Sequence, residues 1–244
     1  MIAAVPDRIR VDQPTPTVSV QIAVYNGARF LAATLDSLLS QSWTDFELLI
    51  VDDGSTDVTP QILADYATRD PRISLLHNPI RRGVSAARNR ALAHSCGRYV
   101  AISDADDCSY PQRLEKQVAF LDAHPAIGVV SAGVSWIDEA GTPLHKDQRP
   151  ADDALLRWRL LFCPPVIHTA SMIRRQCLQS IAGYDEGKPC AVDYDLWLRL
   201  APYTKFYNPP RGIWLSVRRQ PEYLGTTRRR AKSDCHPTYP DSPG

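Results

Sequence analysis

The chain has 244 residues, 44% of them hydrophobic, so it is long enough to bury a real core in one large domain or two closely packed halves. Its 28 basic and 27 acidic residues leave a formal net charge of +1, which excludes an overall electrostatic bias towards nucleic acid or a membrane surface. The composition also excludes a disordered or fibrous chain.

The first sixteen residues contain three prolines, and we expect them to form a leader that reaches the first strand outside the core. They lack the pattern of a secretory signal, and no uncharged apolar run of about 18 residues follows. The six cysteines are scattered, without a C-x-x-C pair that would indicate a zinc site or a disulfide framework. We therefore expect a cytoplasmic protein.

Strand and helix alternate four times in the first part of the chain. Apolar and β-branched runs predict strands at 18–24, 46–53, 72–78 and 99–103. Helical spacing predicts helices at 30–40, 60–67 with Thr59 as N-cap, and 84–95. This alternation is typical of an α/β fold with a mainly parallel central sheet flanked by helices, whose ligands bind beyond the carboxyl ends of the strands.

The pattern is looser beyond Pro111. We predict helices at 113–124, 153–162, 176–185 and 193–203, and strands at 127–137 and 168–175. Trp197, Leu198 and Leu200 are expected in the core. Residues 219–244 are basic and poor in apolar side chains, which predicts a disordered tail.

Three carboxylates, Asp104, Asp106 and Asp107, follow the predicted strand 99–103. Like charges this close disfavour one another's ionised forms, so either solvent dilutes the cost or a cation lies there. A D-x-D at a strand end suits Mg²⁺ or Mn²⁺, which bind one or two carboxylates together with substrate phosphate. The alternative is an acidic turn before the next helix.

Two further stretches end or follow strands at the same predicted edge. Asp52 and Asp53, before a glycine, have acceptors suited to a nucleobase N–H or a ribose hydroxyl, although D-G is also a common turn sequence. Arg81 and Arg82 precede a helix that carries Arg88, and this arrangement suits a diphosphate or the holding of a carboxylate loop in place. The alternative is an arginine-solvated helix face, which we favour for the later Arg90.

Five stretches occur in a definite order: VSVQIAVYNG, DDGSTD, RRGVSAARNRA, ISDADD and VDYDLWLRL. In this order and at these intervals they resemble the family 2 glycosyltransferases, over residues 17–218. The resemblance implies a GT-A (Rossmann-like) fold with a smaller acceptor-side subregion. It also implies a nucleotide-sugar-binding half at 17–110 and an acceptor-binding half at 111–218.

The resemblance implies roles on the donor side for matching positions of this chain. Tyr25 would flank the nucleobase, Asp52 and Asp53 would bind its edge, Arg88 would lie near the nucleotide, and Asp104 would face the ribose. The expected donor is a UDP-sugar.

For the metal and the acceptor, the resemblance implies that Asp106 ligates Mg²⁺ or Mn²⁺ and that Asp107 supports it. Asp193 would be the general base of an inverting transfer, with Asp195 as a neighbouring candidate. Each of these two also suits an ordinary acidic helix start. His168 matches a position near the acceptor, but we favour a structural role for it.

Departures from the family pattern leave a second function open. Ala23 replaces a usual proline, Val192 an acidic neighbour of the base, and Gln220 a histidine after the last core strand. Val192, Gln220 and the basic tail favour, as the alternative, a weakly active or inactive relative that only binds sugar nucleotides or glycans. A dinucleotide oxidoreductase is set aside because YNGARF lacks G-x-G-x-x-G.

The expected partners are a nucleotide-sugar donor and a glycan or lipid-linked glycan acceptor, with no nucleic acid. The basic residues between Arg218 and Lys232 suit peripheral contact with anionic lipid on the cytoplasmic face of a membrane. A solvated tail is the alternative.

Overall fold

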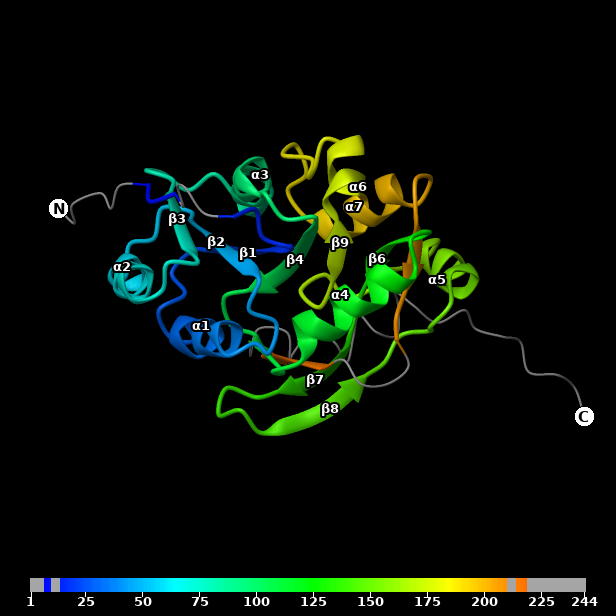
Figure 1. The fold of residues 1–244 in the computed structure, drawn as a ribbon, viewed down its shortest axis with the longest axis horizontal. Coiled ribbons are helices and arrows are strands. Elements are labelled where there is room, and N and C mark those ends of the chain that lie inside the picture. The colour runs from blue at the N-terminus through cyan, green and yellow to red at the C-terminus, as the bar shows by residue number, and fades with distance from the viewer. Residues whose placement is uncertain (1–6, 10–13, 210–213, 219–244) are drawn as a thin grey trace, which may run out of the picture.

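A seven-stranded sheet forms the centre of the molecule (Figure 1). The computed structural model describes residues 7–9, 14–209 and 214–218. In sheet order the strands are β10 (Lys205–Tyr207), β6 (Ile127–Val130), β9 (Met172–Arg174), β4 (Tyr99–Asp104), β1 (Val18–Val24), β2 (Phe46–Asp52) and β3 (Ile73–His77). All neighbouring pairs are parallel except those made by β9. The predicted α/β class with a mainly parallel central sheet is confirmed.

Helices cover both faces of this sheet (Figure 1). On one face, side chains of α1 (Leu31–Leu39), α2 (Thr59–Arg69) and α4 (Arg113–Ala123) share a core with alternate residues of β1, β2 and β4. On the other face lie α3 (Val84–His94), α5 (Asp153–Leu160), α6 (Arg175–Ser180) and α7 (Val192–Leu200). Because both faces are covered, nearly all residues of β1 and β2 are buried, including the polar Ser19, Gln21 and Glu47.

The chain order of the strands creates a switch point beside β1. The chain moves outward from β1 through β2 to β3, and then crosses back so that β4 lies on the other side of β1. At such a point the connections leave in opposite directions, and a crevice opens beyond the carboxyl ends of the strands. The fold therefore places its ligand-binding edge at the ends of β1, β2 and β4.

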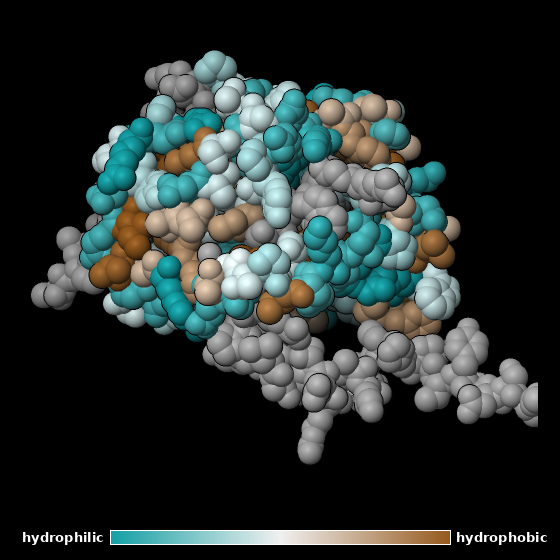
Figure 2. Space-filling model, turned by 90° about the horizontal axis from the view of Figure 1, so that it is seen from below, coloured by the Kyte–Doolittle hydropathy of each residue, from teal (hydrophilic) through white to brown (hydrophobic). Residues whose placement is uncertain are grey.

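A second, four-stranded sheet has the order β5 (Cys108–Ser109), β11 (Trp214–Arg218), β7 (Gly133–Ile137) and β8 (Pro143–Asp147). The single strand predicted at 127–137 is wrong: β6 belongs to the central sheet and β7 to this one. The chain crosses between the two sheets at 131–132. Most β8 residues are exposed. When the molecule is seen from below, hydrophilic residues cover much of the described surface (Figure 2).

Three further predictions are corrected. Val58, not Thr59, is the cap residue of α2, and the Asp57 carboxylate accepts a hydrogen bond from the Thr59 backbone N–H at 2.9 Å. The strand predicted at 168–175 begins only at Met172, because residues 167–171 form a turn with Ser171 N–H bonded to the His168 carbonyl. Leu198 is exposed, whereas Trp197 and Leu200 are buried as expected.

Part of the predicted leader contacts the sheet. Arg8 forms an antiparallel bridge with Leu75 of the edge strand β3, with both backbone hydrogen bonds at 2.8 Å. Arg90, predicted only to solvate its helix, binds the Asp7 carboxylate at 2.5 Å and the His77 carbonyl at 2.7 Å, so that prediction is wrong. The tail predicted at 219–244 lies outside the described residues. In the described ranges, no helix combines the length and apolarity needed to cross a bilayer.

Candidate active site

The acidic groups singled out in the sequence meet at one edge of the central sheet. Val24 at the end of β1 is paired in register with Asp52 of β2, and Ala23 is paired with Asp104 of β4. Both neighbours of β1 therefore deliver a carboxylate to the switch point. The strand pattern predicted this meeting, because the carboxyl ends of parallel strands lie on the same side of a sheet.

Asp52 is buried and bonded within the protein. One carboxylate oxygen accepts a hydrogen bond from Ser55 N–H at 3.0 Å, and the other lies 2.9 Å from Nδ1 of His77 on β3. Its contacts among the described residues stabilise the turn that follows β2 and join this turn to the next strand.

Asp53 holds the segment that leads into α3. Its side chain accepts hydrogen bonds from Asn78 Nδ2 at 2.7 Å, Arg82 N–H at 2.9 Å and Gly83 N–H at 2.8 Å. Gly83 has φ +95°, a conformation that residues with a Cβ rarely adopt, and this brings its N–H to the carboxylate. Asp53 is only 4% exposed, so a nucleobase could contact its carboxylate only in addition to these three hydrogen bonds.

Tyr25, which follows β1, is 39% exposed. The guanidinium carbon of Arg81 lies 4.2 Å from the centre of its ring. This is a cation–π contact. It joins the loop after β1 to the loop before α3 at the rim of the site.

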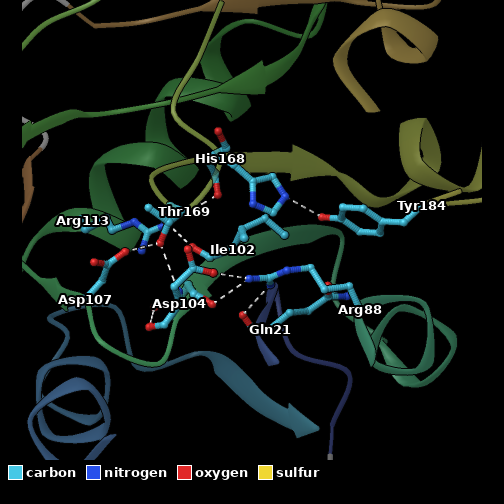
Figure 3. Close-up of polar contacts among 11 residues, drawn as sticks. Gln21, Arg88, Ile102, Asp104, Asp107, Arg113, His168, Thr169 and Tyr184 are labelled. Carbon is cyan, nitrogen blue, oxygen red and sulfur yellow. Dashed lines mark hydrogen bonds and ion pairs between the residues drawn. The ribbon is translucent and has the colours of Figure 1, made fainter. Parts of the chain in front are cut away.

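Arg88 of α3 is buried beside the acidic turn formed by residues 104–107 (Figure 3). It is 1% exposed, and its guanidinium donates to the Asp104 carboxylate at 2.5 Å, the Ser103 carbonyl at 3.1 Å and the Gln21 carbonyl at 3.3 Å. The Asp104 side chain is 47% exposed. Arg88 thus orients an accessible carboxylate from below.

Asp107 points inward instead. It is 2% exposed and accepts a hydrogen bond from the Thr169 hydroxyl at 2.6 Å. The same hydroxyl accepts one from Asp104 N–H at 3.1 Å. Asp106 lies between the two in the turn and is partly buried. Asp107 therefore helps to fix the turn, while Asp104 and Asp106 are the more accessible acids.

Arg113 is a second buried arginine beside this turn. Its guanidinium donates to the carbonyls of Ile102 at 2.6 Å and Thr169 at 3.0 Å, and to the Ser109 hydroxyl at 3.1 Å. Burial lowers the pKa of Arg113 to about 10, and the charges of Asp107 and Asp104 oppose that shift. It therefore stays cationic at neutral pH.

Arg88 and Arg113 explain in part how the carboxylates of the acidic turn can lie so close together. Buried Arg88 is bonded to Asp104, and the charge of buried Arg113 interacts with Asp107 and Asp104, so part of the repulsion among these carboxylates is offset by the protein itself. The sequence left solvent or a bound cation as alternatives for the acidic turn, and it also allowed the arginine stretch 81–91 to hold a carboxylate loop in place. The structure shows that contact for Arg88 and adds Arg113.

A divalent cation still fits the turn. Asp104 and Asp106 offer hard carboxylate oxygens at an accessible strand end, and Mg²⁺ or Mn²⁺ needs only one or two of them when substrate phosphate and water complete its shell. In the part of the chain that the structure describes, no group of three His, Cys, Asp or Glu side chains is arranged to hold a metal ion. The donor set thus suits a metal shared with a substrate rather than a closed metal site.

Asp193 and Asp195 lie on the first turn of α7 but have different surroundings. Asp195 pairs with Arg199 at 2.7 Å and lies 3.9 Å from Lys188. Asp193 is partly buried, and within the described ranges its carboxylate has no hydrogen bond or ion pair. Of the two candidates for a general base, Asp195 already pairs with charged neighbours. Within the described part of the chain, only the Asp193 carboxylate of the two is without a hydrogen bond or ion pair.

His168 and Tyr184 form a neutral pair above Arg88 (Figure 3). The His168 Nε2 atom lies 2.9 Å from the Tyr184 hydroxyl, and the ring also contacts Trp197. Burial, and then the charge of Arg88, hold the pKa of His168 well below its ordinary value of 6.5. Burial also raises the pKa of Tyr184 to about 12, with the charges of Asp104 and Asp193 acting in the same direction. Tyr184 thus lies within electrostatic reach of both acids.

The neutral His168 predicts a loss of stability in mild acid. The unfolded chain takes up a proton at this residue as the pH falls below about 6.5, and the folded protein does not, so stability is lost on the acid side. From pH 7 to pH 5 we expect this residue to cost up to about 2 kcal/mol of unfolding free energy. Urea unfolding at both pH values should show a correspondingly smaller loss in His168→Gln. Equal losses in the two proteins would contradict the assignment.

Several residues of this site were not singled out in the sequence. Thr169, Arg113 and Tyr184 carried no motif of their own, and Asn89 stood inside one of the five stretches without an assigned role. Asn89 Oδ1 accepts from Tyr184 N–H and its Nδ2 donates to the Tyr184 carbonyl, both at 2.8 Å, so it ties the loop before α7 to α3. The available signal was position alone, next to the acidic turn or beside His168.

Known proteins resemble this chain in sequence and in fold. The family model described as glycosyl transferase family 2 matches residues 19–182. The putative glycosyltransferase EpsE of Bacillus subtilis is 37% identical over 187 residues, 75% of this chain and 66% of that protein. The putative teichuronic acid biosynthesis glycosyltransferase TuaG, also of B. subtilis, is 39% identical over 57% of each chain. The chain thus spans less than two thirds of the length of either relative.

Solved structures share the fold. Mannosyltransferase PcManGT from Pyrobaculum calidifontis, in complex with GDP-Man and Mn²⁺, superposes with a TM-score of 0.69 at 26% identity, over 93% of this chain and 64% of that one. S. aureus TarS 1–349 in complex with UDP also gives a TM-score of 0.69, at 23% identity over 85% of this chain and 62% of that one. The expected GT-A fold is confirmed, and the family match over most of the chain shows that the protein belongs to glycosyl transferase family 2.

Proposed function

We propose that the protein is an inverting, metal-dependent glycosyltransferase that moves a sugar from a nucleotide-sugar to a hydroxyl of a glycan or lipid-linked glycan acceptor. One observation carries the proposal: at the switch point the acidic turn 104–107, supported by two buried arginines, lies within electrostatic reach of the same tyrosine as the Asp193 carboxylate. Such an arrangement offers a donor side and an acceptor side in one site.

On the donor side, Tyr25 would flank the nucleobase, and Asp52 and Asp53 would shape the pocket for its edge. Asp104 would face the ribose, with Arg88 holding its carboxylate. These residues fall in the proposed donor half, 17–110. We keep a UDP-sugar as the first donor to test, and the complex of PcManGT with GDP-Man makes a GDP-sugar the second.

Asp106 would hold Mg²⁺ or Mn²⁺, with Asp107 fixing the turn from below. When bound, the metal supplies positive charge that offsets the charge developing on the departing diphosphate. The Mn²⁺ in the complex of PcManGT supports a divalent ion here. Arg88 and Arg113 are already engaged beneath the turn, so they position the acids rather than replace the ion.

On the acceptor side, Asp193 would accept the proton of the attacking hydroxyl. The hydroxyl oxygen forms a bond to the anomeric carbon while the bond from that carbon to the diphosphate oxygen breaks, and the diphosphate leaves with the bonding electrons. A single displacement inverts the anomeric configuration. His168, neutral and bonded to Tyr184, would line the acceptor site in the acceptor half, 111–218. Asp195 would secure α7 through Arg199.

The name of TuaG supports an acceptor of the polysaccharide kind. We propose a cytoplasmic location, supported by the free thiols of the five described cysteines, Cys96, Cys108, Cys163, Cys177 and Cys190. Contact with a lipid-linked acceptor at a membrane surface belongs to this proposal. The alternative, a relative that binds without turnover, is favoured by Val192 beside the proposed base.

Titration calorimetry of UDP and GDP tests the donor half of the proposal. With Mn²⁺ present we expect one of the two to bind, and EDTA should abolish that binding because the diphosphate and the carboxylates then repel one another. Release of the nucleoside diphosphate from the matching sugar donor would then separate an enzyme from a binding relative. Binding unaffected by EDTA would contradict the metal role, and binding without any turnover would favour the alternative.

A further inference from the structure

We infer that Thr169 is a positioning residue that fixes the acidic turn 104–107 for donor and metal binding. The inference rests on the proposed function of that turn. Thr169 stands in the tight turn at 167–171, immediately after His168, in the acceptor half of the chain. More than sixty residues separate it from the acids that it contacts.

The Thr169 hydroxyl bonds to both ends of the acidic turn (Figure 3). It accepts a hydrogen bond from Asp104 N–H at 3.1 Å and donates one to Asp107 Oδ2 at 2.6 Å. A carboxylate can only accept, so the direction of the second bond is fixed. One side chain thus sets the backbone of Asp104 and the carboxylate of Asp107, with Asp106 held between them.

The turn that carries Thr169 is itself held in place. Arg113 donates to the Thr169 carbonyl at 3.0 Å and from the same nitrogen to the Ile102 carbonyl of β4 at 2.6 Å. The Ser171 hydroxyl donates to the Ile167 carbonyl at 2.7 Å. The Thr169 hydroxyl therefore has a defined position, and it can act as a fixed support rather than as an adaptable contact.

This arrangement also connects the two sides of the site. His168, the residue before Thr169, lies within hydrogen-bonding distance of the Tyr184 hydroxyl. The charges of Asp104 and Asp193 both contribute to raising the pKa of Tyr184. Loss of the Thr169 hydroxyl would leave a buried carboxylate and a backbone N–H of the acidic turn each without this partner, and such groups are costly to leave unpaired. The turn would shift or loosen, and the acids above it would lose their preset spacing.

The decisive variants are Thr169→Val, which keeps the shape and removes the hydroxyl, and Thr169→Ser, which keeps the hydroxyl. Hydrogen exchange of the backbone amides in the peptide that spans 99–110 needs no ligand. We expect exchange about tenfold faster in Thr169→Val and unchanged in Thr169→Ser. If the valine variant does not fold, Thr169→Ala replaces it, with the same expectation. Equal protection in the hydroxyl-free and serine variants would overturn the inference.

A second measurement separates this inference from the proposed function. Whichever of UDP or GDP the wild type binds with Mn²⁺ is titrated into each variant. We expect Thr169→Val to bind it about 10- to 100-fold more weakly, with Thr169→Ser within about threefold of wild type. Wild-type affinity in a folded Thr169→Val overturns the positioning role and leaves the proposed function intact. If the wild type binds neither nucleotide, the proposed function fails, and the exchange experiment still decides whether Thr169 fixes the turn.

Discussion

Asp193→Asn is expected to slow sugar transfer by about 10²–10⁴-fold while the affinity for the nucleotide changes by less than about twofold. The amide has nearly the same shape but cannot take the proton of the attacking hydroxyl. In the described part of the chain, the Asp193 carboxylate has no hydrogen bond or ion pair, so its replacement removes no stabilising contact. Steady-state rates with the matching donor and acceptor, beside calorimetric titration, separate the two effects.

Asp195→Asn is the matched control, since it makes the same chemical change two residues along α7. This carboxylate pairs with Arg199, which also donates to the Gly183 carbonyl at 2.7 Å, so we expect a lower melting temperature and a less than about fivefold change in rate. A wild-type rate in Asp193→Asn, or an equal loss of rate in Asp195→Asn, would refute the assignment of the base.

Arg113→Met is expected to destabilise the protein by about 3–5 kcal/mol, enough to leave it largely unfolded if its stability is marginal. Methionine fills a similar volume but leaves several buried acceptors without donors. These include the carbonyls of Ile102 and Thr169 and the Gln117 side chain. Equilibrium urea unfolding followed by circular dichroism measures the loss.

Two variants control for the substitution itself. Arg113→Lys keeps the positive charge but cannot reach all of the acceptors, so an intermediate loss is expected. Arg69→Met makes the same change at a side chain that is 70% exposed, and should alter stability by less than about 0.5 kcal/mol. Equal stability of Arg113→Met and Arg69→Met would contradict the supporting role of Arg113.

Much of the fold could be predicted because local patterns in the sequence mark its strands and helices. The strands 18–24, 46–53, 72–78 and 99–103 are apolar runs between helical patterns, and the observed bounds differ from these by a residue or two at most. Their parallel order then places the ends of β1, β2 and β4 at one edge, which brings Asp52 and Asp104 together. For this reason the meeting of these acidic residues at one sheet edge, where the candidate site lies, could be predicted from the sequence.

The support beneath the site could not be predicted, because it depends on contacts between distant segments. By sequence, Arg113 is an ordinary first residue of a helix. In the structure it is buried and donates hydrogen bonds to the carbonyl groups of Thr169 and Ser171, more than fifty residues later in the chain. The sequence pattern predicts Thr169 in a strand, whereas it lies in the turn that reaches Asp104 and Asp107. Periodicity carries no signal for either contact.

The strands of the second sheet show the same limit. β8 is exposed along most of its length and lacks the alternation of apolar and polar residues that marks a half-buried strand. The split between β6 and β7 is invisible in an apolar run whose two halves pair with different sheets. Tertiary pairing, rather than local propensity, decides these elements.

We expect the acidic turn to bind the diphosphate of a nucleotide through a divalent ion. Calorimetric titration of UDP and GDP, each with Mn²⁺, into the wild type, Asp106→Ala and Asp65→Ala tests it most directly. Asp65 is a matched control because its side chain is 71% exposed on α2. We expect Mn²⁺-dependent binding of one nucleotide by the wild type and Asp65→Ala, and its loss in Asp106→Ala. Undiminished binding by Asp106→Ala, or no binding by the wild type, would contradict it.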